Sequence, residues 1–155
     1  MVLETAFPCE TIPHVQSPSF PDVAETDWFN DIAADAKAKG IIVGVQNPKY
    51  ADPIFEGNRA ITRAEAVKIV VAAGATSTVP HYLNAYAALP SSASVPDASE
   101  FVDVTDPNVW FYPYVYASKS AGIIQGYGDG TNRFGPNDDI TRGQAATIIY
   151  RASGY

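Results

Sequence analysis

The sequence predicts a mainly α-helical fold, in which two tandem helix-loop-helix repeats pack as a small helical bundle with short extended segments. One group of motifs occurs twice in the same order, about 80 residues apart. In each copy, apolar residues recur at the spacing of an amphipathic helix, and helix start and stop signals flank them. Motifs that recur in the same order at nearly the same separation indicate duplication of a single structural unit.

The duplicated motifs set the domain organisation. Three pairs define the repeat: FPDV with FVDV, GIIVG with GIIQG, and ITRAEA with ITRGQA. The members of these pairs are separated by 81, 82 and 79 residues, so the copies differ only by short insertions or deletions. We therefore expect an extended lead-in at 1–19, a first repeat at 20–73, a linker at 74–100 and a second repeat at 101–155.

The first helix of each repeat follows a Trp-Phe pair. In the first copy, an apolar stripe predicts an amphipathic helix that ends at Gly40, and it comprises Trp28, Phe29, Ile32, Ala33 and Ala36. In the second copy, the same face precedes Gly122 and comprises Tyr114, Ala117, Ser118 and Ala121. Pro113 then lies in the first turn, where its missing N–H is harmless.

The second helix of each repeat begins at a threonine. Thr62 and Thr141 precede Glu65 and Gln144 by three residues, which is the capping-box pattern, and an apolar run follows. Short extended pieces are expected between the two helices of each repeat, at 41–43 and 123–125. The linker is rich in Ser, Thr, Pro and Ala at its edges, and a short helix at 81–89 would carry Tyr82, Leu83 and Tyr86.

Both second helices carry an arginine in the first turn, Arg63 and Arg142. The helix dipole disfavours a cation there by about a few tenths of a kcal/mol, so its occurrence in both copies indicates a partner. One interpretation is an internal salt bridge, for instance to Asp22 or Asp103. The other is an anion held jointly by the guanidinium and the N–H groups of the helix start. The residues alone do not decide between them.

The composition argues against several function classes. The net charge is −7 and basic runs are absent, which argues against nucleic-acid binding. Apolar stretches fall short of the roughly 20 residues that span a bilayer. Cys9 is alone, so it is an unpaired thiol or pairs between chains, and nucleophile, Walker and zinc motifs are missing. We therefore expect a protein that is not an enzyme, with no cofactor or metal and no membrane insertion.

Two groups have a structural interpretation beside a functional one. Trp28 and Trp110 are expected in the core, with stacking on sugar rings as the alternative. The loop at 127–139 has oxygen-bearing side chains that suit Ca²⁺, namely Asp129, Asn132, Asp138 and Asp139. It lacks the EF-hand spacing, and its glycines and proline favour a set of tight turns instead.

The order of these motifs resembles the S-layer homology (SLH) family. Residues 101–151 match the family pattern of F-x-D-V, W, G-I-I-x-G, G-D-G-x-x-x-F-x-P-N and I-T-R-A-E across their whole length, and 20–73 match it with a divergent loop. The resemblance implies a noncatalytic module that anchors proteins to the bacterial cell wall, outside the cell. The implied partner is a cell-wall glycan, either an acidic, often pyruvylated secondary cell-wall polysaccharide or a peptidoglycan-linked polymer.

The resemblance also implies site residues. The arginine of the T-R-A-E motif is the family's main ligand-contacting residue, and this favours the anion interpretation for Arg63 and Arg142. With the groups around them, the expected glycan-binding residues are Arg63, Arg142, Thr62, Thr141, Glu65, Gln144, Trp28, Trp110, Asp22 and Asp103.

The number of repeats raises a further expectation. The family commonly packs three repeats around a pseudo-threefold axis, whereas two are visible here. The third position would be covered by the linker segment 81–89, by a neighbouring SLH-containing chain or by a second copy of this chain. We expect the second copy, and hence a homo-oligomer. The alternative function is a structural subunit of a self-assembling surface layer or extracellular filament.

Overall fold

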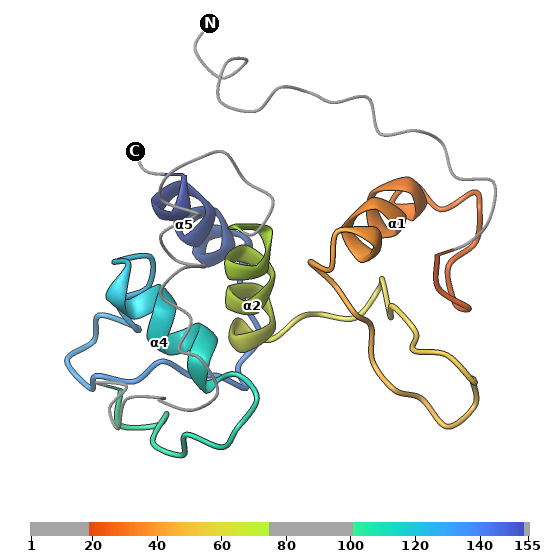
Figure 1. Ribbon diagram of the computed structural model, residues 1–155. Coiled ribbons are helices and arrows are strands. Elements are labelled where there is room, and N and C mark those ends of the chain that lie inside the picture. The colour runs from red at the N-terminus through yellow and green to blue at the C-terminus, as the bar shows by residue number, and fades with distance from the viewer. Residues whose placement is uncertain (1–18, 75–100, 154–155) are drawn as a thin grey trace, which may run out of the picture. The chain divides into compact units, whose positions relative to one another are not determined.

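A computed structural model describes residues 19–74 and 101–153, and these residues form four helices and no β-sheet (Figure 1). The helices are α1 (Asn30–Ala38), α2 (Arg63–Ala73), α4 (Tyr112–Ser120) and α5 (Arg142–Ala152). The prediction of a mainly α-helical fold is therefore confirmed. None of these helices has the length and apolar character needed to cross a bilayer. The predicted linker helix at 81–89 and Cys9 lie outside the described residues.

The chain forms two compact units, Met1–Asn58 and Arg59–Tyr155, and their boundary falls inside the first sequence repeat. Unit 1 contains α1, the first helix of the first repeat. Unit 2 contains α2, the second helix of the same repeat, together with α4 and α5 of the second repeat. The compact units are thus not the same segments as the sequence repeats.

Unit 1 is organised around α1 and the loop that follows it. Its core consists of Phe20, Val23 and Ala33, and the half-buried residues Phe29, Ile42 and Phe55 pack against it. The predicted helical stripe is partly wrong, because Trp28 lies before the helix and both Trp28 and Ile32 are exposed. A helix of nine residues gains its stability mainly from such packing, so only the Phe29–Ala33 side of the stripe contributes.

Unit 2 is a three-helix cluster in which α2 packs against both α4 and α5 (Figure 1). Val67 and Val71 of α2 are fully buried, together with Val115 of α4 and Ile123. Burying one such side chain stabilises the fold by about 1.5–3 kcal/mol. The second helix of the first repeat is therefore built into the core of the second repeat.

The predicted helix ends are confirmed. Gly40 and Gly122 adopt positive φ angles of 70° and 72° just beyond α1 and α4, a conformation that glycine adopts without strain. Both capping boxes form: the Thr62 and Thr141 hydroxyls accept from the N–H groups of Glu65 and Gln144, each at 3.2 Å. These interactions are local, which is why the sequence pattern identifies them.

The segments expected to be extended form no β-ladder. Residues 41–43 and 123–125 run as irregular backbone in the structure. The pairing that does occur nearby consists of two isolated antiparallel bridges, Val45 with Ile54 and Thr62 with Asp139. The second bridge joins the start of α2 to the loop that leads into α5.

Candidate functional site

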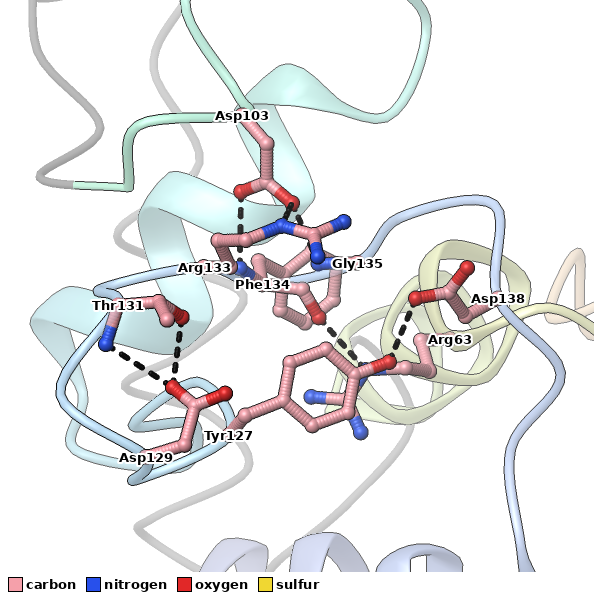
Figure 2. Close-up of polar contacts among 9 residues, drawn as sticks. All are labelled: Arg63, Asp103, Tyr127, Asp129, Thr131, Arg133, Phe134, Gly135 and Asp138. Carbon is pink, nitrogen blue, oxygen red and sulfur yellow. Dashed lines mark hydrogen bonds and ion pairs between the residues drawn. The ribbon is translucent and has the colours of Figure 1, made fainter.

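Arg63 is held by the loop of the second repeat. Its side chain is only 4% exposed. The Nε–H donates to the carbonyl oxygen of Phe134 at 2.7 Å (Figure 2). The guanidinium lies 4.5 Å from the ring centre of Tyr127 and 5.0 Å from that of Phe134, within the range of cation–π attraction. The cation that is unfavourable at a helix start is therefore stabilised by contacts that lie far away in the sequence.

Within the described residues, no carboxylate forms an ion pair with Arg63, so the salt-bridge interpretation is wrong for this residue. Asp103 instead accepts from the N–H groups of Phe134 and Gly135, both at 2.8 Å (Figure 2). Taking a charge out of water costs several kcal/mol unless it is paired. Aromatic faces and one carbonyl compensate only partly, so the described part of the chain supplies no counter-charge to this buried cation.

The backbone at the start of α2 is already occupied. The N–H of Arg63 donates to the carbonyl of Asp138 at 2.9 Å, and the N–H of Ala64 donates to the carbonyl of Pro136 at 3.1 Å. The N–H of Glu65 donates to the Thr62 hydroxyl. The prediction that Arg63 and these N–H groups hold an anion jointly is therefore wrong for α2. Of the Arg63 donors, only the terminal nitrogens of the guanidinium are left without a hydrogen bond among the described residues.

A pocket of about 270 Å³ lies beside the Arg63 guanidinium, between the loop after α4 and one side of α5. Two arginines line it, and none of its lining residues is acidic. Its lining residues are Arg63, Ile123, Ile124, Gln125, Gly126, Tyr127, Gly128, Gln144, Thr147, Ile148 and Arg151. The Arg151 Nη2 donates to Gln125 Oε1 at 3.1 Å, which fixes the second cation beside the pocket. The charge of the lining suits an anion.

Tyr127 closes one side of this pocket as a neutral hydrogen-bond donor. Its hydroxyl donates to the Asp138 carboxylate at 2.7 Å (Figure 2). This hydrogen bond to a carboxylate, more than any other influence, raises the pKa of Tyr127 above its usual value. Asp138 therefore faces the tyrosine hydroxyl, and the ring of Tyr127 stays neutral against the Arg63 guanidinium.

The structure brings only two of the ten predicted site residues, Arg63 and Gln144, to the pocket. Thr62 and Glu65 form the cap of α2, where Glu65 also pairs with Arg59 at 2.8 Å. Asp22 holds the loop of unit 1 by accepting from two backbone N–H groups at 2.7 Å, as Asp103 does in unit 2.

The remaining predicted residues lie on the surface. Trp28 and Trp110 are 85% and 53% exposed, so the core interpretation is wrong for both. Thr141 and Arg142 at the start of α5 are exposed and lie outside the pocket. The Arg142 guanidinium forms neither a hydrogen bond nor an ion pair with any described residue. The two repeated arginines therefore have different surroundings.

Sequence reasoning missed four polar lining residues: Gln125, Tyr127, Thr147 and Arg151. Gln125 and Tyr127 flank Gly126 in the segment after α4, so the repeated GIIxG motif marked their position without revealing their role. Thr147 and Arg151 are four residues apart, which places them on one side of α5. Together with Gln144 they form a polar row that could have been recognised by helical spacing.

The loop at 127–139 consists of tight turns. Gly128, Gly130 and Gly135 adopt positive φ angles of 71°, 83° and 70°. Asp129 accepts from the hydroxyl of Thr131 at 2.6 Å and from its N–H at 3.0 Å, and these bonds lower the pKa of Asp129. In the part of the chain that the structure describes, no three His, Cys, Asp or Glu side chains gather in a group able to hold a metal ion.

Comparisons with known proteins agree with this organisation. The family model of the S-layer homology domain matches residues 19–67 and 105–146, which is more than half of the chain. The chain is 28% identical over 134 residues to the Surface-layer 125 kDa protein of Lysinibacillus sphaericus and 29% identical to the S-layer protein of Bacillus thuringiensis subsp. finitimus. These alignments cover 86% of the chain but only 10% and 13% of the relatives. The matched segments fall in both sequence repeats, and the chain belongs to the S-layer homology domain family.

Proposed function

We propose that the chain is a noncatalytic anchoring module at the outer surface of a bacterial cell. Its ligand is an acidic secondary cell-wall polysaccharide that carries pyruvyl groups, or a peptidoglycan-linked polymer of the same charge. Membership of the S-layer homology domain family and two relatives named as surface-layer proteins support a role at the cell surface. The pocket beside Arg63 supports an acidic ligand.

The observation that carries the proposal is the buried Arg63 guanidinium. Its Nε is used by the Phe134 carbonyl, and its terminal nitrogens form no hydrogen bond within the described residues (Figure 2). A carboxylate on a sugar would supply the missing counter-charge and accept two parallel hydrogen bonds from the planar guanidinium. Charge-assisted bonds of this kind are worth most where water is excluded.

The size and lining of the pocket fit one charged sugar unit. Pockets for drug-sized ligands have volumes of about 300–1,000 Å³, and the pocket here has about 270 Å³. Gln144 and Thr147 offer amide and hydroxyl groups for sugar hydroxyls, and Tyr127 offers a ring edge. The polymer would continue over the surface, where the exposed Trp110 provides a face for stacking. In this scheme Thr62, Glu65, Asp22 and Asp103 hold the scaffold and do not touch the sugar.

Replacing Arg63 tests the proposal. Arg63→Met keeps most of the side-chain volume and removes the charge, so binding of the pyruvylated polymer should weaken by about 1.5–3 kcal/mol, or roughly 10- to 150-fold. The measurement is calorimetric titration with the purified polymer, with and without its pyruvyl groups. Removal of these groups should weaken wild-type binding by a similar factor and leave Arg63→Met unchanged.

Arg133→Ala is the matched control. Arg133 belongs to the same loop, is exposed and lies outside the pocket, 3.7 Å from Asp103. Its removal should leave the dissociation constant within about twofold of wild type, as for a solvent-screened pair. Equal losses in Arg63→Met and Arg133→Ala, or binding that ignores the pyruvyl groups, would refute a specific site at Arg63.

A second candidate function is a structural subunit of a self-assembling surface layer or filament. The observation that favours it is the exposed apolar surface of α5, which includes Ile149 and Tyr150. Sedimentation with and without cell-wall sacculi separates the two functions. Retention that requires the wall polymer supports anchoring, whereas assembly in the absence of any wall supports a structural subunit.

A further inference from the structure

The first repeat contains a loop with the same backbone anchors as the loop that holds Arg63 in the second repeat, although its sequence diverges. We call residues 44–57 of unit 1 the receptor loop. Asp22 accepts from the N–H groups of Phe55 and Glu56, just as Asp103 accepts from those of Phe134 and Gly135. Glu56 adopts a positive φ of 55° where Gly135 has 70°. The same carboxylate therefore fixes the same backbone turn in both repeats.

The entry of the receptor loop has the matching geometry. Gly44 and Gly126 adopt φ angles of 75° and 77°. A Cβ added at either glycine would approach a loop carbonyl and the ring of Phe20 or Phe101, at 3.0 Å or less. Contacts within unit 1 thus hold the receptor loop, through the Asp22 hydrogen bonds and the close packing at Gly44.

The occupant is what differs. In the second repeat, the carbonyl of Phe134 accepts from Arg63. The equivalent carbonyl in unit 1 belongs to Phe55, and within the described residues it accepts no hydrogen bond. An arginine helix is therefore seated in the loop of the second repeat, whereas no described residue donates to the equivalent carbonyl of the first repeat.

The helix α5 has the complementary difference. It is the counterpart of α2 in the second repeat, so Arg142 corresponds to Arg63. The apolar face of α2 that is buried in the core of unit 2 contains Val67, Val70 and Val71. We define the insertion face of α5 as Arg142 and the residues equivalent to these valines: Ala146, Ile149 and Tyr150.

The insertion face is exposed. Ile149 and Tyr150 are 48% and 59% exposed, and Arg142 and Ala146 are exposed as well. The equivalent residues of α2 are buried, and among them Val67 and Val71 are fully buried. The helix α5 thus exposes the face that corresponds to a core face in α2, and no described residue pairs with its Arg142. Exposed apolar faces of this kind usually form an interface, so we expect α5 to make a contact like that of α2.

Charge favours the same match. The helix α5 carries Arg142 and Arg151 and no acidic residue. Residues 19–58 of unit 1 carry seven carboxylates and three lysines. Opposite net charges on α5 and on residues 19–58 therefore favour their association, in a protein whose overall charge of −7 otherwise opposes self-association.

We propose that the insertion face of α5 docks into the receptor loop of a second copy of this chain, with Arg142 donating to the Phe55 carbonyl of that copy. The contact seen in the structure runs from a helix of one repeat to the loop of the repeat that follows it. Continued from the second repeat, the same relation requires another loop of this type, which the first repeat of another copy supplies. The interface is heterologous, because the two surfaces in contact are different.

The contact gives Arg142 a carbonyl acceptor but does not copy the whole Arg63 pocket. Val43 and Val45 of the first repeat stand where Gln125 and Tyr127 line that pocket in the second repeat. The proposed docking therefore does not rest on the proposed function.

The test is sedimentation without any glycan over micromolar concentrations. The wild-type chain should gain mass above 16.6 kDa as concentration rises. Ile149→Asp on the insertion face should stay at 16.6 kDa, whereas Val102→Asp, also on an exposed apolar residue of unit 2, should associate like wild type. Hydrogen exchange over residues 41–57 should slow with concentration in wild type and not in Ile149→Asp.

Mixing two variants, each altered on a different side of the contact, tests whether two different surfaces meet. Ile41, the half-buried counterpart of the buried Ile123, belongs to the other side of the contact. Ile41→Asp alone should stay monomeric, and its mixture with Ile149→Asp should form heterodimers through the one intact pair of surfaces. A wild-type chain that keeps a mass of 16.6 kDa throughout, with or without protection of residues 41–57, overturns docking between copies. Unchanged association of Ile149→Asp overturns it too. Because no glycan is present, these outcomes are independent of sugar binding at Arg63.

Discussion

At the scale of single residues, the two arginines show how one motif serves two environments. Arg63 contributes to folding through its Nε–H and to the pocket through its terminal nitrogens. Arg142 occupies the same motif position, yet no described residue partners it. The two arginines have the same motif position, so the difference in their contacts comes from the loop that lies against Arg63.

The cap of α2 gives a prediction about pH. Glu65 accepts from the Thr62 N–H at 2.7 Å and from Arg59 at 2.8 Å, and the pairing with Arg59 holds its pKa below the ordinary value of 4.5. A carboxylate with a lowered pKa stabilises the folded state above pH 4.5, and this contribution is lost as the pH falls through the lowered pKa. Glu65→Gln should therefore reduce the free energy of unfolding at neutral pH by about 1 kcal/mol or less, because the pair is partly exposed.

Thermal unfolding followed by circular dichroism across pH checks this. The difference between Glu65→Gln and wild type should shrink towards zero in acid. Gln144→Ala is the matched control, because Gln144 fills the same cap position in α5 without a titrating group. Its cost should not change with pH, and a Glu65→Gln difference that persists below the lowered pKa contradicts the assignment.

At the scale of elements, each F-x-D-V motif closes the loop that follows the first helix. Asp103 binds the backbone of Phe134 and Gly135, and Phe134 in turn binds Arg63 at the start of α2. One carboxylate thus connects three segments that lie far apart in the sequence. These hydrogen bonds between segments stabilise the fold more than helix propensity does, since the helices have only nine and eleven residues.

Removing this carboxylate should destabilise unit 2. Asp103→Ala leaves two N–H groups without their acceptor and should lower the free energy of unfolding by about 2–3 kcal/mol. Asp103→Asn keeps one acceptor oxygen and should lose less. Chemical denaturation gives both values, and Asp139→Ala, whose exposed side chain forms no hydrogen bond with any described residue, should stay close to wild type. A cost for Asp103→Ala no larger than that of Asp139→Ala would show that the loop does not depend on this carboxylate.

At the scale of the whole molecule, the net charge of −7 opposes an acidic polymer at long range. Attraction must then arise locally, where the Arg63 pocket collects two guanidinium groups and no carboxylate. Buried and partly buried charges are screened by salt less than exposed ones. The proposed anchoring therefore depends on the buried Arg63 and not on the field of the whole molecule.

Salt dependence tests this distinction. From low to physiological salt, the affinity for the acidic polymer should fall by less than about tenfold, whereas a basic protein that contacts many phosphates loses about a thousandfold or more. Calorimetric titration at several salt concentrations gives the slope. A steep loss of affinity would place the attraction on exposed charges and would contradict binding through the buried Arg63.

The sequence by itself determined the features that depend on neighbouring residues. The glycine helix ends and both capping boxes involve atoms within about one helical turn of each other, so their patterns are visible in the chain. The duplication is visible because each motif is a short run of neighbouring residues. The resemblance to the SLH family followed from the order of the same motifs. The mainly α-helical class was predictable for the same reason.

Only the tertiary structure decided which segments meet. Arg63 binds a carbonyl 71 residues away, in the other repeat, and no spacing rule predicts that partner. The same holds for the boundary between the units inside the first repeat and for the exposure of Trp28 and Trp110, which a helical pattern had suggested were buried. A side chain's burial depends on what the fold places against it. A loop distant in the sequence buries Arg63, whereas the fold leaves both tryptophans exposed.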